Sequence, residues 1–327
     1  MLDINTKKII KNAYRITKDR GITALRVRVP GGSLDVRHLD IIKRIAEEYG
    51  SGRVHITTRQ GFEIPGIPME KIPEINKIIA PLLAGMETDI GVEITDPDGG
   101  YPAAGTRNVS ACIGGNVCCN ANFNTTELAR KIEKIIYPND FHVKIAVTGC
   151  PNDCIKTHMQ DIGVIGMVLP EYDQSRCIGC EACVKNCRKV ATGALSMVNF
   201  KVKRDHRRCL GCGECILKCP ASAWTRGEKY YRLVIMGRTG KKNPRIARTF
   251  LEWVGEEAVL KVIANMYAYI DKYIDRTLPK EHVGYIVDRT GLPVFAREVL
   301  NDVDTGPLGK VAEFIPFGGY VYERSAY

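Results

Sequence analysis

The 327-residue sequence lacks any apolar run long enough to cross a membrane, because its longest stretches, 78–83 and 164–169, are far shorter than the roughly 20 residues of a transmembrane helix. The N-terminal segment 1–8 also lacks the apolar core of a secretory signal. Both absences predict a cytoplasmic protein without a membrane partner. A hydrophobic content of 45% and a charged content of 26% exclude disordered and fibrous classes.

Nucleotide-binding motifs are missing as well. No Gly-x-Gly-x-x-Gly follows a strand-like segment, and residues 237–242 lack the spacing of a phosphate-binding loop. The chain therefore shows no motif with which it would bind a dinucleotide itself. The net charge of +10 calls for anionic partners. The basic run within 7–20 is compatible with docking of a partner or of nucleic acid, but it is more typical of a solvated face, and we predict no nucleic-acid partner.

Cysteine is absent from the first 111 and the last 108 residues, although the chain contains thirteen. In a reducing compartment this density favours metal ligation over disulfides. Eight of them form two runs with Cys-x2-Cys-x2-Cys-x3-Cys spacing and a constant offset of 32 residues: Cys177, Cys180, Cys183 and Cys187, then Cys209, Cys212, Cys215 and Cys219.

This repeat is typical of bacterial ferredoxins, in which the fourth cysteine of each run ligates the cluster of the other run. We therefore predict two 4Fe–4S clusters, one held by the first three cysteines of the first run with Cys219 and one by those of the second run with Cys187. Arg188 replaces the proline that usually follows the first run. Zinc is the alternative, but zinc sites close with four ligands on two Cys-x2-Cys pairs, whereas each run here has four cysteines.

Four further cysteines have a different spacing: Cys112-x5-Cys118 is followed by Cys150-x3-Cys154. They predict a third 4Fe–4S cluster, and the alternative is that they are buried free thiols. The thirteenth cysteine, Cys119, is assigned to packing.

Together with other segments, this last pattern resembles the sirohaem-dependent sulfite and nitrite reductase family. Its other motifs are matched, in the family's order, by Arg26–Gly32 (RVRVPGG), Thr57–Gln60 (TTRQ) and Arg107–Val109 (RNV). The resemblance covers nearly the whole chain. The ferredoxin-type insert after Cys154 is similar to the catalytic C subunits of anaerobic NADH-dependent sulfite reductases.

The resemblance implies a sirohaem whose iron is bridged to the third cluster by Cys154. It further implies an anion site, in which His142 stands where the family has another lysine, and a set of sirohaem contacts. His55 and Glu63 replace the family's usual Arg and Gln at two more contact positions. The anion site comprises Arg28, Arg107, His142 and Lys144, and the sirohaem contacts comprise Thr57, Arg59, Asn108, Cys154 and Arg238.

The chemistry of sulfite explains these residue types. Sulfite must accept six electrons and release its three oxygens as water, so its oxygens need both donors and protons. Arginine offers a planar fork of donors to an oxyanion, whereas the pKa of lysine shifts readily enough to deliver a proton. We predict Lys144 as the proton donor.

Periodicity predicts an α+β fold, and the resemblance implies a ferredoxin-like half-domain that precedes an α/β core containing the insert. Strands are expected at 24–29, 54–58, 143–147, 162–169 and 230–236, and helices at 39–49, 68–83, 126–136 and 256–274. The predicted segments are 1–100 (half-domain), 101–170 (first part of the core), 171–227 (ferredoxin insert) and 228–327 (second part of the core).

The leading hypothesis is a six-electron sulfite reductase that receives electrons through the insert from partner subunits. The resemblance implies that these are an NADH-oxidising flavin subunit and an iron-sulfur subunit. Ammonia-forming nitrite reduction needs the same number of electrons and is the alternative within catalysis. A non-catalytic electron-transfer subunit is the alternative from another class. Because the family builds its site from two copies of this module, a homodimer or a second subunit is expected.

Overall fold

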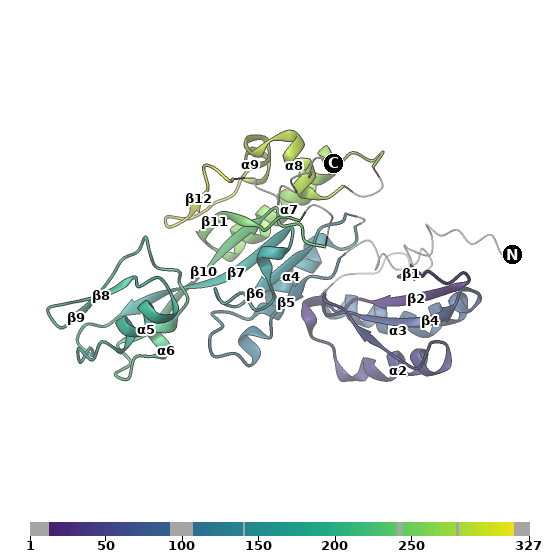
Figure 1. Ribbon diagram of the computed structural model, residues 1–327, viewed down its shortest axis with the longest axis horizontal. Coiled ribbons are helices and arrows are strands. Elements are labelled where there is room, and N and C mark those ends of the chain that lie inside the picture. The colour runs from purple at the N-terminus through teal and green to yellow at the C-terminus, as the bar shows by residue number, and fades with distance from the viewer. Residues whose placement is uncertain (1–12, 92–106, 140, 241–243, 279–280, 317–327) are drawn as a thin grey trace, which may run out of the picture. The chain divides into compact units, whose positions relative to one another are not determined.

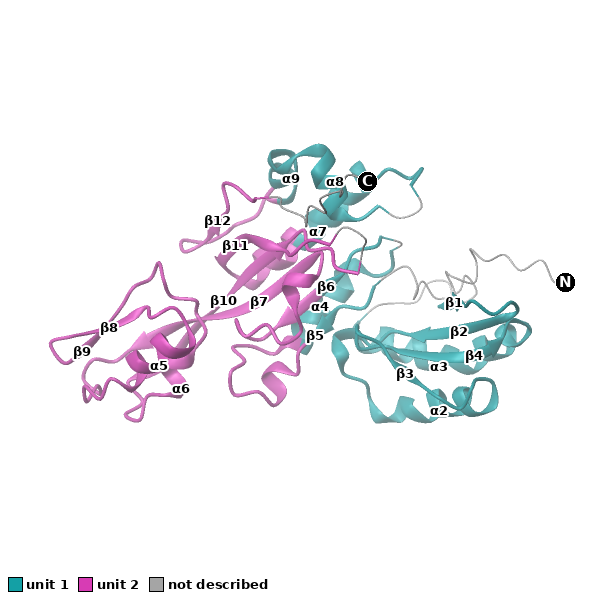
Figure 2. Cartoon of the chain, viewed as in Figure 1, with its two compact units in different colours: residues 1–111, 126–145, 263–299 teal, residues 112–125, 146–262, 300–327 magenta. Residues whose placement is uncertain are grey.

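The computed structural model describes residues 13–91, 107–139, 141–240, 244–278 and 281–316. The chain forms two compact units that interleave along the sequence (Figure 2): residues 1–111, 126–145 and 263–299 make unit 1, and residues 112–125, 146–262 and 300–327 make unit 2. The four predicted segments, by contrast, follow one another. The loop expected at 98–100 lies outside the described residues.

Unit 1 begins with an antiparallel sheet in the order β1-β2-β4-β3. Its strands are β1 (Tyr14–Ile16), β2 (Ile22–Val27), β3 (His55–Ile56) and β4 (Phe62–Pro68), and the helices are α2 (Leu39–Glu48) and α3 (Ile72–Asp89) (Figure 1). Ile42 and Ile45 of α2 are buried in one core with Ile75 and Ile79 of α3, because helical spacing places each pair on one face.

The predicted helix at 39–49 is confirmed, whereas the other elements of this region are shifted. β2 begins two residues before the expected strand at 24–29, and α3 begins later and ends later than the expected helix at 68–83. Pro68 ends β4 and Pro73 lies in the first turn of α3, where a missing N–H costs no helical hydrogen bond. β4 was not predicted.

The rest of unit 1 consists of β5 (Ser110–Ala111), α4 (Thr125–Ile136), α8 (Val283–Thr290), α9 (Leu292–Val299) and most of α7 (Glu256–Tyr273). The predicted helices at 126–136 and 256–274 are confirmed. Val259, Ile263, Met266 and Ile270 of α7 are at most 1% exposed, which confirms this stripe as core.

Unit 2 is built on strands β6 (Ile145–Thr148), β7 (Ile162–Tyr172), β10 (Trp224–Ile235), β11 (Arg248–Val254) and β12 (Lys310–Val311). Their order is β12-β11-β10-β7-β6. β7 and β10 form a long antiparallel pair from Ile162↔Ile235 to Tyr172↔Trp224. The predicted strand at 162–169 lies within β7, and the predicted strand at 230–236 overlaps β10 but ends one residue beyond it. Both observed strands are longer than predicted because each pairs along the other.

Residues 173–223 form an excursion that leaves at the end of β7 and returns at the start of β10. The rings of Tyr172 and Trp224 lie 4.6 Å apart, and the amide of Asp173 donates to the carbonyl of Ala223 at 2.8 Å. The excursion contains α5 (Ala182–Val190), β8 (Leu195–Val198), β9 (Lys201–Arg204) and α6 (Glu214–Leu217) (Figure 1). It has its own small core, so the insert can be built without breaking the larger sheet.

Among the described residues, no helix is long and apolar enough to cross a membrane.

Candidate functional site

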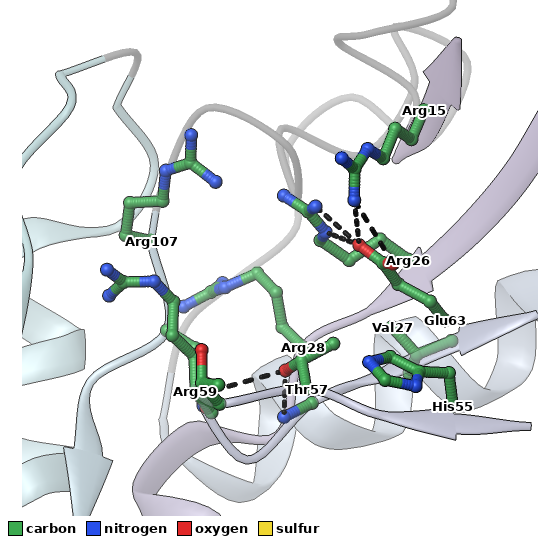
Figure 3. A pocket seen from close by; sticks show the side chains of 12 residues that line it. Arg15, Arg26, Val27, Arg28, His55, Thr57, Arg59, Glu63 and Arg107 are labelled. Carbon is green, nitrogen blue, oxygen red and sulfur yellow. Dashed lines mark hydrogen bonds and ion pairs between the residues drawn. The ribbon is translucent and has the colours of Figure 1, made fainter. Parts of the chain in front are cut away.

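Unit 1 contains a pocket whose lining is strongly basic (Figure 3). It is formed by β2, by the turn before β4 and by the segment before β5. Only one acidic side chain is among the lining residues, and the positive excess suits an anionic ligand. The lining residues are Arg15, Arg26, Val27, Arg28, His55, Thr57, Thr58, Arg59, Gly61, Glu63, Arg107 and Asn108.

One wall of the pocket is the turn at residues 57–61. The Thr57 hydroxyl accepts the amides of Gly61 at 3.1 Å and Arg59 at 3.3 Å, which closes the turn. Gln60 takes a positive φ of 63° and binds the backbone of Ala111 twice, donating through Nε2 at 2.7 Å and accepting through Oε1 at 2.8 Å. The turn is therefore fixed to β5 by two hydrogen bonds.

The segment before β5 is held against the same turn. Asn108 donates through Nδ2 to the carbonyl of Arg59 at 2.7 Å, and the amide of Gly31 donates to the carbonyl of Val109 at 3.0 Å. The three motifs RVRVPGG, TTRQ and RNV, which are far apart in the sequence, therefore meet at one pocket. Thr57 and Asn108 act here by shaping the backbone around Arg59.

Two residues of the predicted anion site contact each other. Arg107 Nη2 lies 2.9 Å from His142 Nδ1, and because arginine has no acceptor, it must donate to an unprotonated Nδ1. The His142 ring also packs on His282 with centroids 5.7 Å apart. Lys144 is half-buried two residues further on, directly before β6, and Val143 between them is buried.

Glu63 replaces the family's usual glutamine and neutralises part of the pocket. It accepts from Arg26 Nε at 2.8 Å and from Arg15 at 3.4 Å (Figure 3). Burial raises its pKa, but the hydrogen bonds and charges of Arg26 and Arg15 outweigh this and hold the pKa below its ordinary value. His55, which also departs from the family pattern, pairs with Glu63 across β3 and β4.

Arg28 is clamped between two buried carboxylates. It is 2% exposed, donates to Glu87 at 3.2 Å, makes a second ion pair with Glu133, and lies over the Tyr137 ring at 4.8 Å. Glu133 also accepts the amide of Val109 at 2.7 Å, so α4 ties this arginine to the RNV segment. Arg28 is thus a lining residue of the pocket whose buried guanidinium is held in one orientation by two carboxylates.

The clamp contains one negative charge more than Arg28 can neutralise. Burial raises the pKa of Glu87 to about 7, Arg28 lowers it, and Glu133 raises it further. In the unfolded chain the carboxyl returns to its ordinary pKa of 4.5. Between pH 4.5 and about 7, the folded chain keeps the Glu87 proton that the unfolded chain has lost. The free energy of unfolding therefore falls as the pH rises from about 4.5 to about 7.

We expect Glu87→Gln to abolish this pH dependence. Relative to wild type, the variant should gain about 1–3 kcal/mol in free energy of unfolding at pH 8 and much less at pH 5.5. Denaturant titrations at both pH values measure the difference, and Glu70→Gln, at an exposed carboxylate, is the control. An equal effect of Glu87→Gln at both pH values would show that Glu87 is ionised throughout.

The four cysteines of the predicted third cluster lie together in unit 2. The amide of Gly149 donates to Cys112 Sγ at 3.2 Å. Burial raises the pKa of Cys150 to about 11, and the charges of Cys118, Cys154 and Cys112 add to the shift, which places all three thiols near it. Cys150 is buried, whereas Cys154 is exposed. Residue 149 must be glycine, because a Cβ there would lie 2.8 Å from that of Ala121.

The excursion repeats its backbone as well as its cysteines. Positive φ angles of 69° and 65° at Gly179 and Gly211 are 32 residues apart, and so are those of 60° and 78° at Glu181 and Gly213. Gly179 and Glu181 flank Cys180, the second cysteine of the first run, and Gly211 and Gly213 flank Cys212 in the second run.

The fourth cysteine of each run lies beside the other run. The charge of Cys219 contributes to the raised pKa of Cys183, after burial, and the charge of Cys187 contributes in the same way at Cys212. Each fourth cysteine is therefore close enough to a cysteine of the other run for its charge to act there. Burial and neighbouring thiols also raise the pKa of Cys215 to about 12.

Two predicted assignments concern single residues of unit 2. Arg238 is 5% exposed and forms a β-bridge with Arg245, so its backbone is fixed beside a second buried arginine. Cys119 is exposed, and its carbonyl accepts from Arg226 at 2.8 Å. An exposed thiol does not pack in a core, so the assignment of Cys119 to packing is wrong.

Sequence reasoning missed three residues that organise the pocket: Gln60, Glu87 and Glu133. Gln60 was visible as the last letter of TTRQ, but its role in fixing the turn depends on the position of Ala111. The two glutamates had no local signal, since each resembles an ordinary helix-surface residue until α3 and α4 bring them to Arg28.

Two family models match the chain. "Nitrite/Sulfite reductase ferredoxin-like half domain" matches residues 15–82, and "Nitrite and sulphite reductase 4Fe-4S domain" matches residues 103–305. The chain belongs to the nitrite and sulphite reductase family, as its motifs predicted. The α+β fold with a ferredoxin-like half domain is confirmed.

Individual relatives agree with this assignment. The chain is 42% identical over 307 residues to the C subunit of the anaerobic sulfite reductase of Salmonella typhimurium, covering 93% of this chain and 91% of the relative. It is 32% identical to "Coenzyme F420-dependent sulfite reductase" of Methanocaldococcus jannaschii, covering 85% and 42%, and 27% identical to the chloroplastic ferredoxin–nitrite reductase of Zea mays, covering 48% and 26%.

Solved structures share the fold. Dissimilatory sulfite reductase I superposes with a TM-score of 0.64 at 16% identity, covering 91% of this chain and 74% of the other. The NirA protein of Mycobacterium tuberculosis superposes with a TM-score of 0.53 at 16% identity, covering 88% and 42%.

Proposed function

We propose that this chain is the catalytic subunit of a sulfite reductase, which reduces sulfite to sulfide with six electrons and six protons and releases three waters. The observation that carries the proposal is the arginine-lined pocket at which the three motifs meet. The Salmonella relative, an anaerobic sulfite reductase chain that matches 93% of this one, favours sulfite over nitrite as the substrate.

The pocket residues fit a sirohaem. Its peripheral carboxylates need cationic partners, and five arginines line the pocket against the single carboxylate of Glu63. Thr57, Arg59, Asn108 and Arg238 would hold the macrocycle, and Cys154 would be its cysteine ligand. The sirohaem would supply the redox chemistry of an iron at which the sulfur of sulfite can be reduced.

The protein's own side chains bind the anion and move its protons. Arg107 presents fixed N–H donors to the sulfite oxygens and orients His142, while Arg28 is held in place by Glu87 and Glu133. Lys144 delivers protons to the departing oxygens, since an ammonium is both a donor and an acid. Charge complementarity therefore favours binding of the sulfite dianion over binding of neutral molecules.

The twelve cysteines other than Cys119 would hold three 4Fe–4S clusters. Each run of the excursion has four cysteines, whereas a zinc site closes with four ligands on two Cys-x2-Cys pairs, and this pattern supports clusters over zinc. The two clusters of the excursion would relay electrons from donor subunits that oxidise NADH on a flavin, in the cytoplasm.

Purification under anaerobic conditions tests the assignment. We expect visible tetrapyrrole absorption, iron and acid-labile sulfide in the ratio of three 4Fe–4S clusters to one haem iron, and sulfide formation from sulfite with reduced methyl viologen. Faster turnover of nitrite than of sulfite would favour the ammonia-forming alternative. Clusters without tetrapyrrole absorption would indicate an electron-transfer subunit. Native mass measurement would show whether the module pairs with a second copy.

A further inference from the structure

The hairpin of β8 and β9 has an unusual tip. Val198 pairs with Lys201, so the loop between the strands is the two residues Asn199 and Phe200, with φ angles of 50° and 59°. Two-residue loops with both φ angles positive favour Asn followed by Gly, because a side chain at the second position is crowded. Phenylalanine at this position is conformationally unfavourable, and a role other than local folding would explain why this residue is here.

The same side chain is also unfavourably solvated. Phe200 is 81% exposed, the highest value among the large apolar side chains of the described residues, and Ile178 is 70% exposed. The two residues belong to one surface, because a Cβ on Gly179 would lie 3.3 Å from the carbonyl oxygen of Phe200. Phe200 is therefore unfavourable both in its backbone conformation and in its exposure to water.

The hairpin tip is fixed to the first cysteine run. Lys201 donates through Nζ to the carbonyls of Gln174 at 2.8 Å and Cys177 at 2.9 Å. Figure 1 shows the hairpin beside α5 and α6 in unit 2. A protein that contacts Phe200 would thus lie next to the loop that carries Cys177 and Cys180.

The surroundings of the tip are basic. Five of the ten residues 199–208 are Lys or Arg, and only Asp205 is acidic. Lys203 and Arg207 are exposed. A second copy of this basic chain would be repelled from this face, whereas an acidic protein with an apolar contact would complement it.

We propose that Phe200 and Ile178, surrounded by Lys203 and Arg207, form the docking surface for an acidic electron-carrier protein. The reduced carrier gives one electron to the cluster held by the first run, which is reduced by one electron, and the oxidised carrier then leaves. This inference rests on the proposed function, because it assumes that a cluster occupies the first run.

The test uses the full-length protein and a small acidic bacterial-type ferredoxin as the probe, with the dissociation constant measured by calorimetry at low ionic strength. Phe200→Gly should weaken binding about tenfold or more, as expected for an exposed aromatic that anchors an interface, while Phe200→Trp should bind nearly as wild type. Lys203→Glu should weaken binding severalfold and flatten its salt dependence.

The glycine variant separates docking from folding, since Asn-Gly suits the turn and its thermal midpoint should equal or exceed that of wild type. Leu217→Ser and Lys218→Glu, exposed on or beside α6, are the matched controls and should bind as wild type. Equal dissociation constants for wild type and Phe200→Gly would overturn the docking surface, and so would dissociation of a dimer of this chain by that variant. If the variants show the expected dissociation constants but the protein reduces no sulfite, the proposed function is refuted and the docking surface is retained.

Discussion

Cys154→Ser is expected to abolish sulfite reduction while the protein stays folded. Cys154 and Cys118 are the two exposed cysteines of this group, whereas Cys150 is buried, so exposure leaves these two able to reach a ligand outside the protein core, and the family pattern selects Cys154. A serine hydroxyl is a poor ligand for the soft iron site that a thiolate serves. We expect the link between cluster and haem to be lost together with turnover.

Cys119→Ser is the matched control for this variant. Cys119 is also exposed and lies next to Cys118, but it has no place in the Cys-x5-Cys, Cys-x3-Cys pattern. The control should retain wild-type activity and spectra. Mössbauer spectra report magnetic coupling between cluster and haem iron, and coupling that survives in Cys154→Ser would disprove the bridging assignment.

Lys144→Met should lower turnover by about 10²–10⁴-fold without loss of the tetrapyrrole, because methionine keeps most of the length of the side chain but removes its proton and its charge. Lys144 is half-buried directly before β6, which limits the mobility of its side chain and keeps its ammonium near one position. Lys134→Met, at an exposed lysine of α4, is the control.

Steady-state rates with reduced methyl viologen measure this effect, and the visible spectrum reports the cofactor. Lys144→Arg should preserve anion binding better than turnover, since a guanidinium does not release its proton, so this variant should keep KM and lose kcat. Wild-type turnover in Lys144→Met with sirohaem bound would remove Lys144 from proton delivery.

The cysteine grid, the motifs and the main helices were readable from the sequence because their information is local. The cysteine pattern consists of short spacings within each run, and the 32-residue offset survives in the backbone as repeated positive φ angles at Gly179 and Gly211. The helix at 256–274 was equally legible, since its buried stripe follows the period of a single helix.

Only the tertiary structure decided how the pocket is built. Arg28 was predicted as an anion-binding residue, but its two carboxylate partners, Glu87 and Glu133, come from helices 59 and 105 residues further along the chain. Gln60 fixes the pocket turn through Ala111, 51 residues away.

The return of the excursion beside its departure point was likewise settled by strand pairing between β7 and β10. The interleaving of the two units follows from contacts between distant segments, which no local pattern predicts. The sequence by itself determined which chemical groups this protein has and their local spacing. Burial and long-range pairing determined which of those groups share a charge, because the electrostatic state of a buried side chain depends on neighbours that no local pattern records.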